Sequence, residues 1–143
     1  MYCQLEDIQK QVYQDTLIQL TDDNQTGEIN PDVIDEAIMY SSILIDGYLR
    51  GRYILPLSQT PAIISIIAVD LCIFRLYSRR FDTNMPETVK EKYAHSIKML
   101  EQIQKGKLLL GIEPTEIPME AREYQTNKDF RKKIFPRCRL NEY

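Results

Sequence analysis

The sequence contains no tryptophan, one histidine and only three cysteines in 143 residues. One histidine leaves little room for a His-based nucleophilic triad or a His-rich metal centre, because such sites need partner residues that this chain lacks. Cys3, Cys72 and Cys138 are far apart in sequence, form no CxxC pair and are odd in number, which argues against a disulfide framework. The sequence therefore predicts reduced thiols, no metal centre and no cofactor, and it disfavours an enzyme.

Long hydrophobic runs are also missing. The longest, Ala62 to Val69, is interrupted by Ser65 and stops at Asp70, well short of the ~20 residues that a bilayer span requires. The first ten residues include acids and no apolar stretch typical of a secretory signal. With 43% hydrophobic and 27% charged residues the composition is that of a globular protein. We expect one compact domain with a tail, made and kept in a cytosol and making no membrane contact.

Charge is distributed unevenly along the chain. Residues 1–46 have a net charge of −9, residues 47–111 of +5 and residues 112–143 of +1, which together give the total of −3. Within the last part, residues 128–139 hold six bases and one acid. Such a patch suits an acidic surface, a phosphate backbone or simply water.

Apolar spacing predicts an all-α protein. Residues 4–12 and the turn around Leu17 indicate two short helices, and the polar, Asx-rich stretch 21–30 indicates a loop. Asn30 before Pro31 is a helix start, because Asn caps well and proline at the first position loses no hydrogen bond. That helix runs to Arg50, with Gly51 after it. Its inward stripe follows 4-3-4-3 spacing: Ile34, Ile38, Ser41, Ile45 and Tyr48.

Two further long helices follow. Residues 52–58 cannot continue a helix through Pro56, so we expect an extended link that places Tyr53, Ile54 and Leu57 in the core. Thr60-Pro61 then repeats the cap signal and starts a nearly all-apolar central helix over residues 61–77. A third long helix starts at Pro86, presents the stripe Val89, Tyr93, Ser96, Leu100 and Ile103, and is closed by Gly106.

After Gly111 the character changes, since residues 112–120 contain two prolines and three glutamates without periodicity. The predicted organisation is a helical domain, 1–111, made of three long helices with short N-terminal helices, and an extended C-terminal arm, 112–143. The arm combines apolar anchors with bases, so we predict that it binds partner proteins. The residues concerned are Phe130, Arg131, Lys132, Lys133, Ile134, Phe135, Arg137 and Leu140.

The loop at 22–30 resembles an EF-hand loop, with Asp22, Asn24 and Thr26 at ligand positions 1, 3 and 5 and Gly27 at position 6. Position 12 is Val33, where a bidentate glutamate normally completes the calcium shell. We therefore expect an Asx-stabilised turn that holds its shape without metal, with calcium binding as the alternative.

Asp70 is an acid within the most apolar helix, where an ionised carboxylate is costly unless it is paired. We interpret it as a structural buried acid with an arginine partner, so that Asp70→Asn should lower thermal stability. The candidates for that partner are Arg50, Arg52, Arg79 and Arg80. An enzyme built around Asp70 is the weaker alternative. His95 lies off the apolar stripe and is expected at the surface, with no role.

Four segments carry a more specific pattern. In chain order they are LIQLTDD (17–23), IDGYLRGRYILPL (45–57), VDLCIFRLYSRR (69–80) and MPETVKEKY (85–93). Together they resemble the Mu-like prophage family of small head–tail connector proteins, long classed as a domain of unknown function. The likeness is collinear over about residues 1–111 and covers residues 112–143 only loosely.

The resemblance implies an all-helical adaptor that forms a homo-oligomeric ring, usually a dodecamer, beneath the portal of a tailed phage or phage-like particle. The partners implied are the portal protein and the next neck or tail-completion protein, in the virion neck, after assembly in the bacterial host cytoplasm. No catalytic motif is implied. A rival interpretation is a nucleic-acid-binding module, although the acidic first third would repel DNA. It would place six bases on phosphates: Lys128, Arg131, Lys132, Lys133, Arg137 and Arg139.

Overall fold

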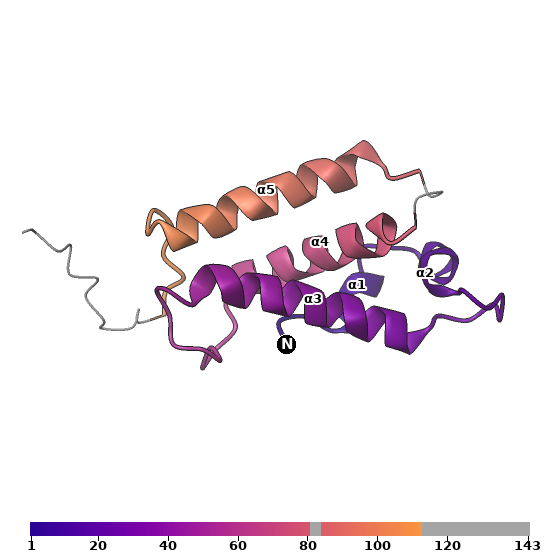
Figure 1. Ribbon diagram of the computed structural model, residues 1–143, viewed down its shortest axis with the longest axis horizontal. Coiled ribbons are helices and arrows are strands. Elements are labelled where there is room, and N and C mark those ends of the chain that lie inside the picture. Colours follow the sequence, from indigo (N-terminus) through magenta and orange to yellow (C-terminus); the bar gives the residue numbers. More distant parts are fainter. Residues whose placement is uncertain (81–83, 113–143) are drawn as a thin grey trace, which may run out of the picture.

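A computed structural model describes residues 1–80 and 84–112 of the chain. Within these ranges the protein is entirely helical and has no strand, which confirms the predicted all-α class (Figure 1). The elements are α1 (Leu5–Gln9), α2 (Gln14–Thr21), α3 (Pro31–Leu49), α4 (Ala62–Ser78) and α5 (Glu87–Gln104). The predicted arm lies outside the described residues, apart from Ile112. No helix in the described ranges has the length and apolar character needed to cross a bilayer.

The central helix is α4, as its apolar sequence predicts. It runs antiparallel to α3 and α5, which also contact each other, while α1 and α2 pack against its other side (Figure 1). Most of its side chains are therefore covered, and the buried ones are Ile64, Ile67, Ala68, Val69, Leu71, Cys72, Ile73 and Leu76. Ala62 at the start of the helix and Ile66, which is 55% exposed, are exceptions. A helix covered on several sides needs apolar residues around most of its circumference, which is why this segment shows little periodicity.

The stripes predicted for α3 and α5 face α4. In α3 the residues at 34, 38, 41 and 45 are buried, and in α5 those at 96, 100 and 103 are buried. The start of α3 is also confirmed, because the Asn30 side chain accepts a hydrogen bond from the Asp32 N–H at 3.0 Å and Pro31 opens the helix. The later helices begin one residue beyond the predicted position. Pro61 and Pro86 are themselves the capping residues, since each has an extended ψ, and neither cap carries a side-chain hydrogen bond.

The link between α3 and α4 is partly mispredicted. Tyr53 is buried and its hydroxyl accepts a hydrogen bond from the Leu110 N–H at 3.3 Å, and Leu57 is partly covered. Ile54, by contrast, is 71% exposed, so its predicted place in the core is wrong. The segment also begins with a turn and not with the predicted extended chain, because the N–H groups of Arg52 and Tyr53 both bond back to the Leu49 carbonyl, at 2.9 and 3.0 Å. This turn leaves Tyr53 against the core and Ile54 in solvent.

Gly106 ends α5 in the left-handed region, with φ +74°, as predicted for the residue after the cap. A Cβ at this position would also collide with the guanidinium of Arg52. We expect Gly106→Ala to lower the free energy of unfolding by about 1–3 kcal/mol, because a residue with a Cβ is strained at this φ. The guanidinium is the far end of a flexible side chain and can move aside, so the backbone strain accounts for the loss. Urea denaturation measures the loss. Gly51→Ala is the matched control, because its Cβ would meet open space and its φ is not in the left-handed region; an equal loss there would contradict the explanation.

Candidate functional site

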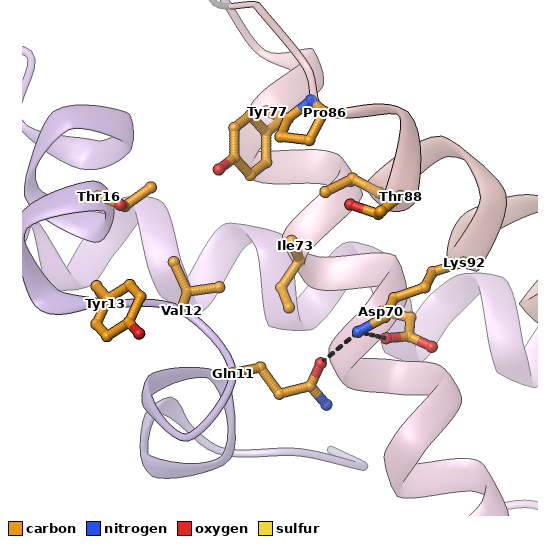
Figure 2. A pocket seen from close by; sticks show the side chains of 11 residues that line it. Gln11, Val12, Tyr13, Thr16, Asp70, Ile73, Tyr77, Pro86, Thr88 and Lys92 are labelled. Carbon is orange, nitrogen blue, oxygen red and sulfur yellow. Dashed lines mark hydrogen bonds and ion pairs between the residues drawn. The ribbon is translucent and has the colours of Figure 1, made fainter.

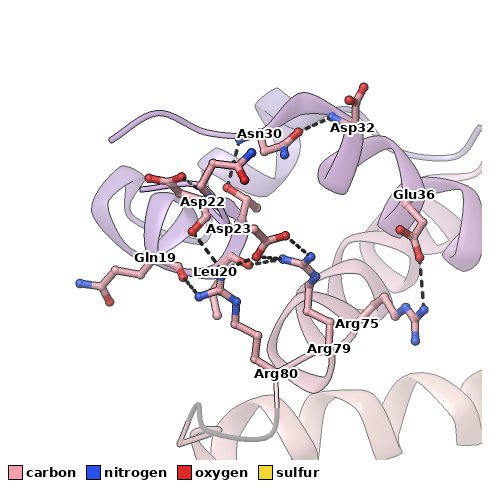
Figure 3. Close-up of polar contacts among 12 residues, drawn as sticks. Gln19, Leu20, Asp22, Asp23, Asn30, Asp32, Glu36, Arg75, Arg79 and Arg80 are labelled. Carbon is pink, nitrogen blue, oxygen red and sulfur yellow. Dashed lines mark hydrogen bonds and ion pairs between the residues drawn. The ribbon is translucent and has the colours of Figure 1, made fainter. Parts of the chain in front are cut away.

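The loop between α2 and α3 is held together by the carboxylate of Asp22 (Figure 3). Its Oδ1 accepts hydrogen bonds from the N–H groups of Thr26 at 2.9 Å and Asn24 at 3.2 Å, and its Oδ2 from the Gly27 N–H at 2.7 Å. These backbone bonds lower the pKa of Asp22, those from Thr26 and Gly27 most strongly. The predicted Asx-stabilised turn is thus present, with Gly27 at φ +75°. In the described residues no three His, Cys, Asp or Glu side chains are grouped so that they could hold a metal ion.

Two arginines at the end of α4 fix this loop to the core (Figure 3). Arg79 binds Asp23 with both terminal nitrogens, at 3.1 and 2.5 Å, and donates to the carbonyl of Leu20 at 2.9 Å. Arg80 also pairs with Asp23 and donates to the carbonyls of Gln19 and Asp22, at 3.2 and 3.0 Å. Carbonyls at the end of a helix lack partners within it, so the arginines complete α2 as well as neutralising Asp23.

The two guanidinium groups lower the pKa of Asp23 to about 2, Arg79 contributing more. Because the folded-state pKa lies below the ordinary 3.8, the pairing is complete above that value and is lost as the pH falls through about 2. We expect Asp23→Asn to raise hydrogen exchange across residues 22–30 several-fold at neutral pH and to have little further effect near pH 2. Exchange measured by mass spectrometry tests this. Glu28→Gln, in the same loop, is the control, and identical exchange in both variants would refute the anchoring role.

Asp70 has a lysine as its cationic partner, so the predicted arginine is wrong. Lys92 on α5 places its Nζ 4.0 Å from Oδ1, and the Ser96 hydroxyl donates to Oδ2 at 3.3 Å. Lys92 also donates to the Gln11 side chain at 3.2 Å (Figure 2). The Asp70 side chain is only 12% exposed. Burial raises its pKa, since the weak attraction of Lys92 and the bond from Ser96 do not offset the loss of water.

The raised pKa reverses the sign that the sequence suggested for Asp70→Asn. A carboxylate that is less favourable in the folded chain costs stability above its ordinary pKa of 3.8, and the cost vanishes below it. We expect Asp70→Asn to stabilise the protein by roughly 1 kcal/mol at pH 7, the low end for a poorly compensated buried polar group, and to lose that gain toward pH 3. Thermal unfolding at both pH values measures it. Glu91→Gln, on the exposed side of α5, is the control; a destabilised Asp70→Asn would restore the original expectation.

Asp70 borders a cavity of about 230 Å³ between the α1–α2 connection, α4 and the start of α5 (Figure 2). Val12, Ile73 and Val89 give it an apolar floor, and Asp70 and Lys92 are its charged groups. Nucleophilic catalysis requires a nucleophile beside a base, and acid–base catalysis requires paired groups of different pKa. The Asp70 carboxylate and the Lys92 ammonium, 4.0 Å apart, form a loose ion pair, and in the described residues neither bonds a hydroxyl group of the cavity lining. His95 is exposed, as predicted, and does not line the cavity.

The segment ahead of α1 brings together residues that are remote in sequence. Tyr2 and Cys3 are buried, and the Tyr2 hydroxyl donates to Asp46 on α3. Cys3 and Cys72 are free thiols whose sulfurs lie 3.6 Å apart. The bond with Cys3 and burial raise the pKa of the Cys72 thiol, which therefore stays protonated. The third cysteine, Cys138, lies outside the described residues.

An exposed apolar surface on α3 is the feature that sequence reasoning missed. Met39 is 54% exposed and Ile43 64%, on the side of the helix away from α4. The sequence does contain a pattern that indicates this surface. Residues 35, 39, 43 and 47 are spaced four apart and form a second row on the helix, separate from the inward stripe. The predicted partner-binding residues of the arm, from Phe130 to Leu140, lie outside the described residues.

Comparison with known proteins gives consistent matches to phage proteins. Residues 2–128 match the family model described as "Bacteriophage Mu, Gp36". The chain is 30% identical over 91 residues to "Gene product J" of Escherichia phage Mu, covering 62% of each protein. It is 28% identical over 88 residues to "Mu-like prophage FluMu protein gp36" of Haemophilus influenzae, covering 62% of this chain and 60% of the relative. The chain thus spans about three fifths of the length of these curated relatives.

Proposed function

We propose, from the premise that the chain belongs to the bacteriophage Mu Gp36 family, that it is a structural head–tail connector of a tailed phage or phage-like particle. In this proposal the chain forms a ring beneath the portal protein. The family resemblance of the sequence implies that the ring is a dodecamer. It receives the next neck or tail-completion protein and resides in the neck of the virion. It acts through protein contacts and catalyses no reaction.

The observation that carries this proposal is the exposed apolar surface of α3. The helices pack around one core, yet Met39 and Ile43 remain largely in contact with water. Apolar residues gathered on a protein surface mark contacts with other molecules more often than isolated ones do. A connector requires such surfaces, because every subunit of a ring contacts two neighbours.

Loss of the protein from particles tests the connector role. In a host carrying the phage with a stop codon early in this gene, we expect filled heads and free tails to accumulate without joining. Electron microscopy of the lysate shows the products, and expression of the intact chain from a plasmid should restore complete particles. Normal particles without the protein, or a block before heads form, would exclude this function.

Sedimentation of the purified full chain with and without duplex DNA separates the connector from the nucleic-acid-binding alternative. We expect the sedimentation coefficient to be unchanged by DNA at physiological salt. A binding protein that neutralises several phosphates would instead co-sediment at low salt and release DNA steeply as salt rises. That second result would favour the alternative.

A further inference from the structure

The outward side of α3 carries a row of residues spaced one helical turn apart: Asp35, Met39, Ile43 and Gly47. We call these the outer row, and all of them are exposed. The neighbouring row on α3 contains Glu36 and Tyr40, and both of these residues contact Arg75 on α4. Glu36 pairs with Arg75 at 3.3 Å, and the Arg75 guanidinium lies 4.8 Å from the ring centre of Tyr40. The outer row has no comparable contact in the part of the chain that the structure describes.

Gly47 is an independent sign that another molecule covers this row. Glycine inside a helix costs about 0.5–1 kcal/mol relative to alanine. A Cβ at Gly47 would meet nothing within 4 Å, so packing among the described residues 1–80 and 84–112 does not require glycine there. Its φ is not in the left-handed region either. A missing side chain at this position instead permits close approach of a partner's backbone.

The charges around the outer row select a basic partner. The helix α3 contains four acids and neither lysine nor arginine. Asp32 and Asp35 lie at one end of the row, and Asp46, which is half-buried and accepts a hydrogen bond from the Tyr2 hydroxyl, lies beside the other. An apolar strip between carboxylates is complementary to an apolar segment that carries lysines and arginines.

We propose that the outer row binds residues 128–140 of a second copy of this chain. That segment supplies Phe130, Ile134, Phe135 and Leu140 for the apolar strip and six bases for the carboxylates. Most of it lies beyond residue 128, where the family match ends, so the contact belongs to this chain and not to the family pattern. The inference rests on the proposed ring, in which one surface of each subunit meets a different surface of the next.

The length of the chain is sufficient for this contact. The described residues end at Ile112, next to Leu110, which is bonded to Tyr53 just after α3. From residue 112 to residue 128 an extended chain spans roughly 50 Å, whereas α3, with 19 residues, is about 28 Å long. The segment can therefore pass beyond its own α3 and reach a neighbour.

A photo-crosslinking experiment identifies the occupant. The full chain carries p-benzoylphenylalanine in place of Met39 and is prepared in ¹⁴N and ¹⁵N forms. Equal amounts of the two forms are mixed as dissociated subunits, assembled together and then irradiated. We expect cross-links from position 39 into residues 128–140, half of them joining peptides of unlike isotope. The same label in place of Ile66, which is 55% exposed on α4, is the matched control and should give none to that segment.

Three outcomes would overturn the inference. Cross-links joining only peptides of one isotope would show that each chain covers its own α3. Cross-links to other regions would identify a different occupant. A full chain that stays monomeric up to about 1 mM would show that no such contact exists at useful strength.

Mixing two full-length variants provides a second test. The first variant, Ile43→Asp, disrupts the outer row. The second variant combines Phe130→Ser with Phe135→Ser and disrupts the segment that binds to it. Each variant alone should be monomeric by sedimentation, and an equal mixture should form dimers through the one intact contact. Absence of mixed dimers contradicts the proposal.

Gly47→Ala separates assembly from folding. It should raise the thermal midpoint of the monomer while shifting half-assembly to ~10-fold higher concentration, as for the loss of about 1.4 kcal/mol of binding. If ring formation is unaffected by Ile43→Asp, the inference fails while the connector proposal stands. If heads and tails join without the protein, the connector proposal fails.

Discussion

Removal of residues 113–143 should leave a folded, helical and soluble core that builds neither stable connectors nor complete particles. The sequence placed the start of the arm at residue 112, but Ile112 packs partly against the core, so the truncation is made after it. In the described residues the apolar faces of the three long helices pack into one core, which is why we expect that core to fold without the arm. The arm supplies the bases and apolar anchors that we assign to assembly, so we expect its loss to affect particles and not the fold.

Circular dichroism and thermal unfolding of the truncated chain test the first half of this prediction, and complementation of the stop-codon phage tests the second. A chain that ends at residue 127 is the matched control, because it keeps the acidic, proline-containing part of the arm and loses the basic part. We expect it to fail in the same way. An unfolded truncated chain would place the arm within the core, and normal joining of heads and tails would make it dispensable.

Leu71→Ala should lower the free energy of unfolding by about 3–5 kcal/mol. Leu71 lies near the middle of α4 and is completely buried. Replacing a buried leucine with alanine removes its transfer free energy and leaves a cavity that the surrounding helices fill only partly. For a small domain of marginal stability this approaches the whole free energy of folding.

Urea denaturation of both Leu71→Ala and Ile66→Ala measures the effect. Ile66 is five residues away on the same helix and more than half exposed, so its replacement should cost less than about 0.5 kcal/mol. Similar losses in the two variants would contradict the arrangement in which α4 is buried on most of its circumference.

The fold was predictable where local chemistry decides it. Asn30-Pro31 and Gly106 mark a helix start and a helix end because capping depends on neighbouring residues. The stripes of α3 and α5 were predictable because each of these helices has one buried face and one solvent-exposed face. In α4 nearly every position is apolar, so spacing could not distinguish the buried Ile67 from the exposed Ile66.

The candidate sites were less predictable because they depend on distant elements. Arg79 and Arg80 were among the candidate partners of Asp70. At the end of α4, however, both arginines bind Asp23, whereas Asp70 on the same helix faces α5. The sign of the Asp70 effect depends on how closely a cation approaches, which sequence does not give. The outer row escaped notice because its apolar residues are indistinguishable in type from those of the core.

The contact between Cys3 and Cys72 has a consequence for the order in which the chain can fold during synthesis. The two residues are separated by 69 positions, and the covering of Tyr2 and Cys3 depends on α3 and α4. At about 5–20 residues per second, a ribosome adds the intervening chain in roughly 3–14 s. For that time Cys3 lacks the surface of α4 that covers it, and the core closes only when its central helix has emerged.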